Sequence, residues 1–331
     1  MGAADSLGFG VIGVGAIGRL HAEHLATRVP AASLIAVADI NAAVARSEAE
    51  RLDVAAYPDH AALLADPAVA AVAICTPRGT HAQIIKDAAA ADKHIFCEKP
   101  LAGSLEEIDD AMAAVEKAGV LLQVGFNRRF DASFAHVHAQ IVAGAIGAPQ
   151  IIHIVSRDPE PADGQASRTP ADLILETTIH DLDMASYLAG SEITSVHALG
   201  LPASEPGRLD GAIIVLRLAN GVVATIDNHL RSAFGYDQRL EVFGTAGALS
   251  IANETPHRTT LAGKAGIIDP LPLHFFAERY VDSYIAELSA FARCVGEKTV
   301  PPVTASDGRT AVVAALAALH SLREGRPVAL A

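Results

Sequence analysis

Few cysteines, no tryptophan and no long apolar run limit the classes of protein to which this 331-residue chain can belong. Only Cys75, Cys97 and Cys294 occur, and none has the short paired spacing of a zinc site or a redox motif. We interpret them as small apolar core residues in a reducing compartment, and we expect no bound metal. No apolar run approaches the roughly 20 residues of a membrane-spanning helix, and the N-terminus lacks a secretory signal. The expected location is therefore the cytoplasm, away from membranes.

Basic residues are also scarce, because 25 lysines and arginines stand against 38 aspartates and glutamates, for a formal net charge of −13. Neutralising a polyanion requires clustered lysine and arginine, so the composition argues against nucleic acid as a partner. Hydrophobic residues make up 51% of the chain, and its length fits two domains of about 150 residues each. The composition predicts a soluble globular protein.

The first half of the chain alternates short apolar runs with segments of helical period, which is the pattern of parallel βαβ units. The expected strands lie near 9–14, 33–39, 70–76, 94–98 and 120–125. The expected helices lie near 16–28, 41–51, 59–65, 80–92 and 104–118. Ser104 is the predicted N-cap of the last helix, and Glu107 completes a capping box. The predicted architecture is a doubly wound α/β sheet, a Rossmann domain over 1–125.

The first predicted strand becomes a helix through Gly13-Val-Gly15-Ala-Ile-Gly18. In a dinucleotide-binding unit the first glycine makes the tight turn, the second leaves room for the pyrophosphate, and the third lets the helix pack on the strand. The phosphates then meet the free amides of the helix N-terminus. Asp39 ends the next apolar run, where a carboxylate hydrogen-bonds the adenosine ribose and repels a 2′-phosphate. The pattern favours NAD over NADP; a structural turn with Asp39 capping the next helix is the alternative.

Two later strands end at prolines, in "CTPRGTH" and "CEKPLA". Ligands of open α/β sheets bind outside the carboxyl ends of the strands, so we expect Thr76, Pro77, Glu98 and Lys99 near the nicotinamide. Lys99 would place a positive charge where an alcohol oxygen becomes negative as hydride leaves. A solvated strand-end pair is the alternative. The other predicted cofactor-binding residues are Ala16, Ile17, Ile40 and His81.

After the segment "GAIGAP" the pattern changes to strands joined by turns, with Asn220-Gly221 as a strong hairpin signal. It predicts a second domain of α+β type over 126–331, built on an antiparallel sheet. Two closing helices are expected near 275–296 and 304–323, where they either pack back on the first domain or support the sheet.

Between these strands, "DLILETTIHDLDMASYL" has the apolar spacing of a helix. Glu176, His180 and Asp183 fall at i, i+4 and i+7 and are expected on one face. A histidine beside a carboxylate can take a proton near neutral pH, which the oxidation of an alcohol requires. The alternatives are a structural histidine among solvated carboxylates and a divalent metal site.

Together, the glycine turn, "VADIN", "CTPRGTH", "CEKPLA" and "IHDLDMA" resemble the Gfo/Idh/MocA family of sugar and polyol oxidoreductases, across both halves of the chain. The stretches "GFNRRFDASF", "SRDPEP" and "YDQRLEVFGTAG" are similar to its inositol 2-dehydrogenase branch. The resemblance implies a Rossmann domain followed by a large, mostly antiparallel open sheet, commonly in a tetramer. It also implies that Lys99 contacts nicotinamide and substrate and that His180 is the catalytic base.

The resemblance further implies that Arg129, Asp158 and Tyr236 lie near the bound polyol. Glu176 departs from the pattern, because aspartate is usual at its position, and Arg78 stands where an asparagine often follows the proline. The extra methylene of Glu176 extends its carboxylate farther into the site. We assign Glu176 to the catalytic group, where it either orients the base or holds a neighbouring hydroxyl.

These observations predict an NAD-dependent enzyme that oxidises a secondary alcohol of a cyclic polyol, an inositol or a close relative, to a ketone by hydride transfer. A homo-oligomer, tetramer or dimer, is expected. A pyranose sugar dehydrogenase using NAD or NADP is the nearest alternative. More distant ones are a glycosidase that retains NAD and a sensor that binds NAD without turnover.

Overall fold

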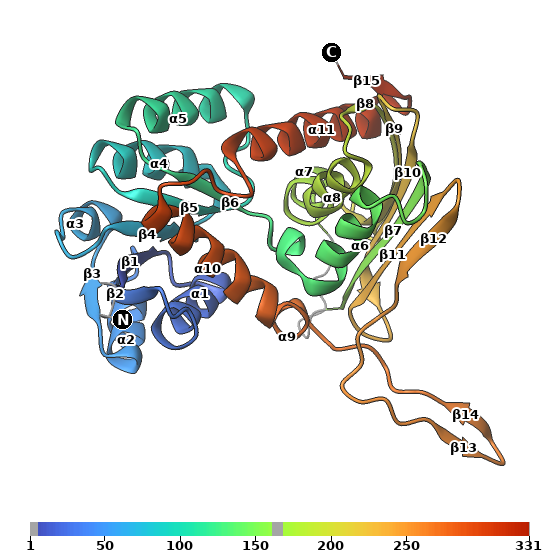
Figure 1. Ribbon diagram of the computed structural model, residues 1–331, viewed down its shortest axis with the longest axis horizontal. Coiled ribbons are helices and arrows are strands. Elements are labelled where there is room, and N and C mark those ends of the chain that lie inside the picture. Colours follow the sequence, from blue (N-terminus) through green and yellow to red (C-terminus); the bar gives the residue numbers. More distant parts are fainter. Residues whose placement is uncertain (1–5, 161–167, 331) are drawn as a thin grey trace. The chain divides into compact units, whose positions relative to one another are not determined.

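The computed structural model describes residues 6–160 and 168–330, which form two compact units (Figure 1). The first unit comprises Met1–Phe130 and Asp282–Val312, and the second comprises Asp131–Val281 and Val313–Ala331. The chain therefore returns to the first unit after most of the second has been built. Within the described ranges, no helix combines the length and the apolar character needed to cross a membrane.

The first unit is built on a six-stranded sheet with the order β3-β2-β1-β4-β5-β6. All neighbouring strands run parallel, which confirms the predicted doubly wound sheet. The strands are β1 (Leu7–Ile12), β2 (Ala32–Ala38), β3 (Ala55–Tyr57), β4 (Ala71–Ile74), β5 (His94–Glu98) and β6 (Leu122–Gly125). The four residues of β4 are all fully buried, as expected for a central strand covered on both faces.

Helices follow the strands of this sheet in alternation. They are α1 (Ala16–Thr27), α2 (Ala42–Leu52), α3 (His60–Leu64), α4 (His81–Ala90) and α5 (Leu105–Ala118), with short 3-10 turns η1 (Arg78–Thr80) and η2 (Asn127–Phe130). The predicted N-cap of α5 is confirmed, because Ser104 Oγ accepts the N–H of Glu107 at 3.3 Å. A later helix, α10 (Val281–Glu297), belongs to the same unit, and its Phe291 packs edge-on against Phe9 of β1 at 6.0 Å between ring centroids.

The second unit is built on a seven-stranded sheet with the order β12-β11-β7-β10-β9-β8-β15. Among the strands that the structure describes in this sheet, only the β7–β10 pair is parallel, so the predicted mostly antiparallel sheet is confirmed. Its strands are β7 (Pro149–Pro159), β8 (Ile193–Pro202), β9 (Leu209–Leu218), β10 (Val223–Ser232), β11 (Asp237–Gly244), β12 (Gly247–Ile251) and β15 (Val328–Ala329). The predicted hairpin joins β9 to β10, and Gly221 adopts the positive φ of +89° that its turn requires.

Helices cover one face of this sheet (Figure 1). They include α6 (Ala132–Val142), α7 (Pro170–Asp172), the π-helical turn η3 (Leu173–Thr178) and α8 (Ile179–Ala189). The remaining elements are α9 (Phe276–Arg279), α11 (Ala305–Glu324) and a hairpin of β13 (Leu261–Gly263) and β14 (Gly266–Ile268). On the other face, β9 exposes Ile213 and Val215 while the alternate residues Ile214 and Leu216 are fully buried.

Candidate functional site

The glycine turn between β1 and α1 has the geometry that a bound pyrophosphate needs. Gly13 has a φ of +86°, and a Cβ on Gly18 would lie 1.9 Å from the carbonyl oxygen of Gly13. Gly15 is exposed, and a Cβ there would meet nothing within 4 Å. Gly13 is thus required by its backbone conformation and Gly18 by close packing. Gly15 leaves open space at the N-terminus of α1.

Asp39, at the end of β2, stabilises the backbone on both sides of the cofactor turn. Its Oδ2 accepts the N–H of Val14 at 3.0 Å, and its Oδ1 accepts the N–H of Asn41 at 2.8 Å. Asn41 in turn caps α2. The alternative that Asp39 itself caps this helix is therefore wrong, although Asp39 does hold the backbone at Val14 and Asn41. Each carboxylate oxygen keeps a further lone pair for a ribose hydroxyl, and the neighbouring Ile40 side chain is 95% exposed.

The ends of β4 and β5 are joined through a buried histidine. His81 lies at the start of α4, with Nε2 2.6 Å from the carbonyl oxygen of Thr76 and Nδ1 2.7 Å from that of Pro100. Burial lowers the pKa of His81, although both hydrogen bonds and Glu98 oppose the shift. Thr76 is half-buried and Pro77 is exposed. His81 was predicted to bind the cofactor. In the structure it lies in the interior of the first unit, where it connects the ends of β4 and β5.

Glu98 and Lys99, which follow one another at the end of β5, lie in different environments. Glu98 is 7% exposed, and its Oε1 lies 2.8 Å from Nε2 of His21. Its Oε2 accepts the main-chain N–H of Lys99 at 3.3 Å. Lys99 itself is half-buried. The alternative of a solvated pair is wrong for Glu98, whose carboxylate turns toward α1.

The predicted catalytic helix of the second unit contains a π-helical turn that the sequence pattern did not reveal. Glu176 lies in η3 and is exposed, and His180 lies in the first turn of α8 and is half-buried. Asp183, expected on the same face, is instead 4% exposed and buried. A π-turn takes about one more residue than an α-turn, so the α-helical spacing does not hold from Glu176 to His180, whereas His180 and Asp183 keep it within α8.

A buried hydrogen-bond network anchors the backbone on both sides of His180. Asp181 accepts Ser156 Oγ–H from β7 and Asn228 Nδ2–H from β10, both at 2.8 Å. Thr178 Oγ1 donates to Asn228 Oδ1 at 2.6 Å. All four side chains are fully buried. Sequence analysis missed them, although the signal was present: Ser156 and Asn228 are polar residues at inward positions of otherwise apolar alternation.

The three residues assigned to the polyol by resemblance come from both units. Arg129, in η2 of the first unit, has a nitrogen of its guanidinium 3.1 Å from Oδ1 of Asp307, so it has a carboxylate partner in the same unit. Asp158 is half-buried near the end of β7 in the second unit. Tyr236, also in the second unit, is 8% exposed, and its ring meets that of Tyr280 edge-on at 6.0 Å.

A parallel sheet with an open glycine turn after its first strand, and an acidic residue after its second, defines a dinucleotide-binding protein. Residues 7–126 match the family model described as "Oxidoreductase family, NAD-binding Rossmann fold", and residues 134–250 match the Gfo/Idh/MocA C-terminal domain. The chain belongs to the Gfo/Idh/MocA family of oxidoreductases, as the motifs predicted. The family description also confirms NAD as the cofactor.

Similar proteins match almost the whole chain. An uncharacterized oxidoreductase of Bacillus subtilis, YrbE, is 43% identical over 327 residues, which cover 97% of this chain and 96% of that protein. Myo-inositol 2-dehydrogenase of Thermotoga maritima is 40% identical, with 97% and 98% covered. The crystal structure of scyllo-inositol dehydrogenase from Lactobacillus casei with bound NAD(H) and scyllo-inositol has a TM-score of 0.93 at 29% identity, with 98% and 99% covered. The similarity therefore extends over both units.

Proposed function

We propose that this protein is an inositol dehydrogenase, which oxidises a secondary hydroxyl of a cyclic polyol to a ketone with NAD as hydride acceptor. The observation that carries the proposal is the similarity, over nearly the full length, to enzymes named for inositol oxidation, one of them solved with NAD(H) and scyllo-inositol. We propose that this closely related chain acts on the same kind of substrate as those enzymes, an inositol.

The residues of the first unit fit a bound dinucleotide. The turn from Gly13 to Gly18 receives the pyrophosphate in the open space at Gly15, while Asp39 binds the ribose hydroxyls. The exposed Ile40 side chain packs against the adenine side, and Thr76 and Pro77 line the nicotinamide side. The carboxylate of Asp39 disfavours a 2′-phosphate and with it NADP.

Two side chains share the chemistry at the hydroxyl. His180 in its neutral form takes the hydroxyl proton, and the buried network around Asp181 keeps the backbone at this histidine fixed. The ammonium of Lys99 stabilises the negative charge that grows on the oxygen. Glu176 orients His180 or holds a neighbouring hydroxyl.

The ring hydroxyls away from the reacting carbon need polar partners. We assign these contacts to Arg129, Asp158 and Tyr236, whose residue types suit a polyol. Arg129 is held by Asp307, so its guanidinium is oriented before substrate binds.

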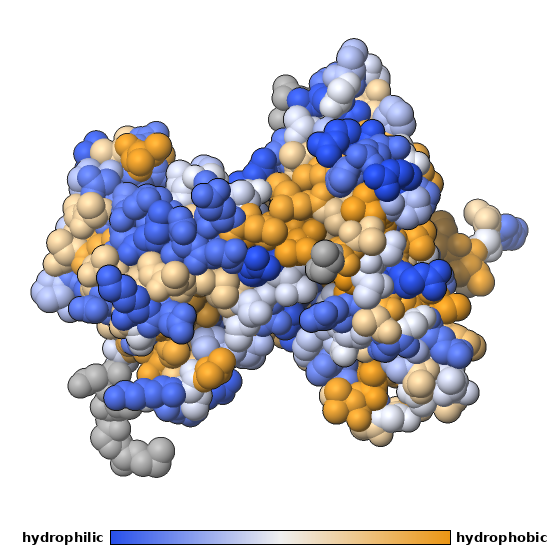
Figure 2. Space-filling view, turned by 90° about the horizontal axis from the view of Figure 1, so that it is seen from above, coloured by the Kyte–Doolittle hydropathy of each residue, from blue (hydrophilic) through white to orange (hydrophobic). Residues whose placement is uncertain are grey.

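We further propose a homo-oligomer, a tetramer or a dimer, in the cytoplasm. Apolar side chains reach the surface of the second unit in several places (Figure 2). On the sheet face without helices they include Ile151, Leu199, Ile213, Val215 and Phe243, each at least 36% exposed. Polar residues such as Asp227 and Thr225 lie beside them on this face, and exposed apolar side chains in this number favour association with a second copy. All three cysteines are free and buried, which fits a reducing compartment.

The deciding experiment measures NADH formation with NAD or NADP across a panel of inositols and common pyranoses. We expect turnover on an inositol with NAD. Turnover on pyranoses alone would show that the substrate is a pyranose sugar and not an inositol. Tight NAD binding with no turnover across the panel would contradict the dehydrogenase and favour the retained-NAD glycosidase or the sensor.

A further inference from the structure

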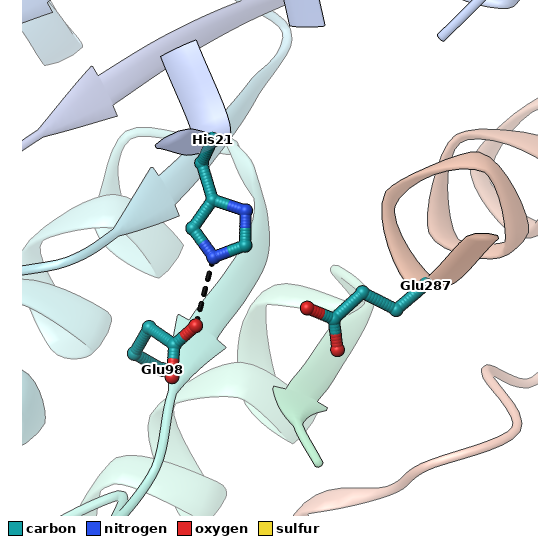
Figure 3. Close-up of side chains that lie close together, drawn as sticks. All are labelled: His21, Glu98 and Glu287. Carbon is teal, nitrogen blue, oxygen red and sulfur yellow. Dashed lines mark hydrogen bonds and ion pairs between the residues drawn. The ribbon is translucent and has the colours of Figure 1, made fainter. Parts of the chain in front are cut away.

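A buried cluster of one histidine and two glutamates adjoins the strand end that carries Lys99 (Figure 3). His21 comes from α1, Glu98 from the end of β5 and Glu287 from α10, so all three belong to the first unit. One nitrogen or oxygen of each lies within 4.8 Å of the others. His21 and Glu287 are fully buried, and the carboxyl group of Glu287 points toward the other two (Figure 3).

Hydrogen-bond donors are distributed unequally between the two glutamates. Glu98 has a donor on each oxygen: the N–H of Lys99 on Oε2, and Nε2 of His21 at 2.8 Å on Oε1. A carboxylate only accepts, so Nε2 of His21 carries its hydrogen. Among the described residues, neither oxygen of Glu287 has a hydrogen-bond partner. A buried carboxylate without donors is strongly unfavourable, whereas a neutral carboxylic acid is tolerated.

We propose that His21 and Glu287 are positioning residues for Lys99 that act through Glu98. His21 and the Lys99 amide hold the ionised carboxylate of Glu98, while Glu287 remains a neutral carboxylic acid, so only one of the two carboxyl groups is charged. The backbone from which the Lys99 side chain extends is thereby fixed against α1. The catalytic part of this inference rests on the proposed function, in which Lys99 contacts the reacting oxygen.

The electrostatics agree with this placement of the proton. Burial, and then the negative charge of Glu98, raise the pKa of Glu287 well above the ordinary carboxyl range. Other titratable groups also act on the pair. Burial raises the pKa of the Cys75 and Cys97 thiols well above the usual value, so they stay neutral, and burial lowers the pKa of His81, a shift that Glu98 opposes. The ring of Tyr284 meets the ring of His21 edge-on at 5.5 Å.

The proton can be observed directly by infrared difference spectroscopy between the parent and Glu287→Gln at neutral pH. We expect the parent to show the carbonyl stretch of a protonated carboxylic acid and the variant to lack it. Glutamine has nearly the same shape as the neutral acid, so the variant should fold. Absence of the band in the parent would overturn the proposal. Elemental analysis gives a second outcome that would overturn the proposal: one divalent metal ion per chain in the parent and none in Glu287→Gln.

Stability against pH gives a second readout. The pKa of Glu287 is raised in the folded state, so its contribution to folding is complete below the ordinary carboxyl range and is lost as pH rises toward the raised value. In this window the folding equilibrium constant of the parent should therefore fall as pH rises. Relative to that of Glu287→Gln, it should fall by up to about tenfold per pH unit. Equal slopes would contradict the proposal.

His24 supplies the matched control for the stability series. It lies on the same helix as His21 and is buried, and burial, with a smaller effect of His21, lowers its pKa to about 4. It is therefore neutral at and above neutral pH. Above the ordinary histidine pKa, His24 is neutral in the folded and the unfolded state, so in that part of the window His24→Gln should keep the steep fall of the parent that Glu287→Gln loses.

Kinetics of His21 variants test whether the cluster positions Lys99. His21→Gln keeps an N–H donor for Glu98, so we expect kcat within a few-fold of the parent. His21→Leu removes the donor, and we expect kcat to fall about tenfold or more with the KM for NAD changed much less. Equal kcat for both variants would overturn the positioning role. If no polyol turns over, the proposed function fails, while the infrared and stability readouts still decide the protonation of Glu287.

Discussion

At the scale of single residues, His180 is the group on which the proposed proton transfer depends. We expect His180→Ala to lower kcat about 10²-fold or more, because no other group then takes the hydroxyl proton. NAD affinity should stay unchanged, since the dinucleotide is assigned to the turn at Gly13 to Gly18. Steady-state kinetics and NAD titration measure the two effects, with exposed His136 on α6 changed to alanine as the control. Turnover within a few-fold of the parent would show that another residue is the base.

Asp39 determines the choice between NAD and NADP in our proposal. Asp39→Asn removes the charge and leaves one amide oxygen, so it keeps an acceptor for one of the N–H groups of Val14 and Asn41 and loses the other. We expect the ratio of kcat/KM for NADP to that for NAD to rise about tenfold or more, because repulsion of a 2′-phosphate is lost. The free energy of unfolding should fall by only about 1 kcal/mol. An unchanged cofactor ratio would mean that Asp39 serves only the backbone.

Single residues were predictable where their role is local. Gly13, Gly18 and Ser104 act on backbone within a few positions, and the sequence placed each of them correctly. The buried partners were not predictable in the same way, because Thr178 and Asn228 are 50 residues apart and meet only in the folded unit. The carboxylate of Glu98 likewise pairs with a histidine 77 residues earlier.

At the scale of elements, two glycines at the junction of β1 and α1 have different roles. Gly18 is needed for the fold, and Gly15 is assigned to the cofactor. Gly18→Ala brings a Cβ to 1.9 Å from the carbonyl oxygen of Gly13, so we expect the free energy of unfolding to fall by about 3 kcal/mol or more. Gly15→Ala meets no atom within 4 Å and should leave stability nearly unchanged. It should weaken NAD binding at least about tenfold, because the methyl group occupies the space for the pyrophosphate.

Chemical denaturation and NAD titration of both variants check this separation. The two glycine variants serve as controls for each other, since each carries the same added methyl group. Loss of stability in Gly15→Ala, or full NAD affinity in that variant, would contradict the assignment of the open space to the pyrophosphate.

Elements with strong periodicity were predicted to within a few residues, and weak ones were missed. The strand β3 has three residues, none of them buried, so no apolar run marked it. Thr178 at the end of the π-turn η3 has a local and a tertiary neighbour, since its Oγ1 lies 3.3 Å from the carbonyl oxygen of Leu173 and 2.6 Å from Oδ1 of Asn228 in β10. An apolar period of 3.6 residues indicates a helix there but does not show the extra residue in one turn.

At the scale of the whole molecule, the sequence did not decide where the last helices pack. Amphipathic helices near 275–296 and 304–323 fit either domain by composition. In the structure, α10 packs on the first sheet, where Leu288 and Phe291 are fully buried. The same helix brings Glu287 to Glu98. Part of the first unit is therefore supplied by chain that follows the second sheet.

The uncovered face of the second sheet predicts how the molecule assembles. Val215 of β9 is 41% exposed on this face, so Val215→Lys should cost a single chain little but place a charge in the interface of an oligomer. We expect light scattering after size-exclusion chromatography to show a smaller assembly for this variant than for the parent. Val300→Lys, at a residue that is 76% exposed in the first unit, is the control and should leave the mass unchanged. A parent of single-chain mass, or an unchanged Val215→Lys assembly, would exclude this face as the interface.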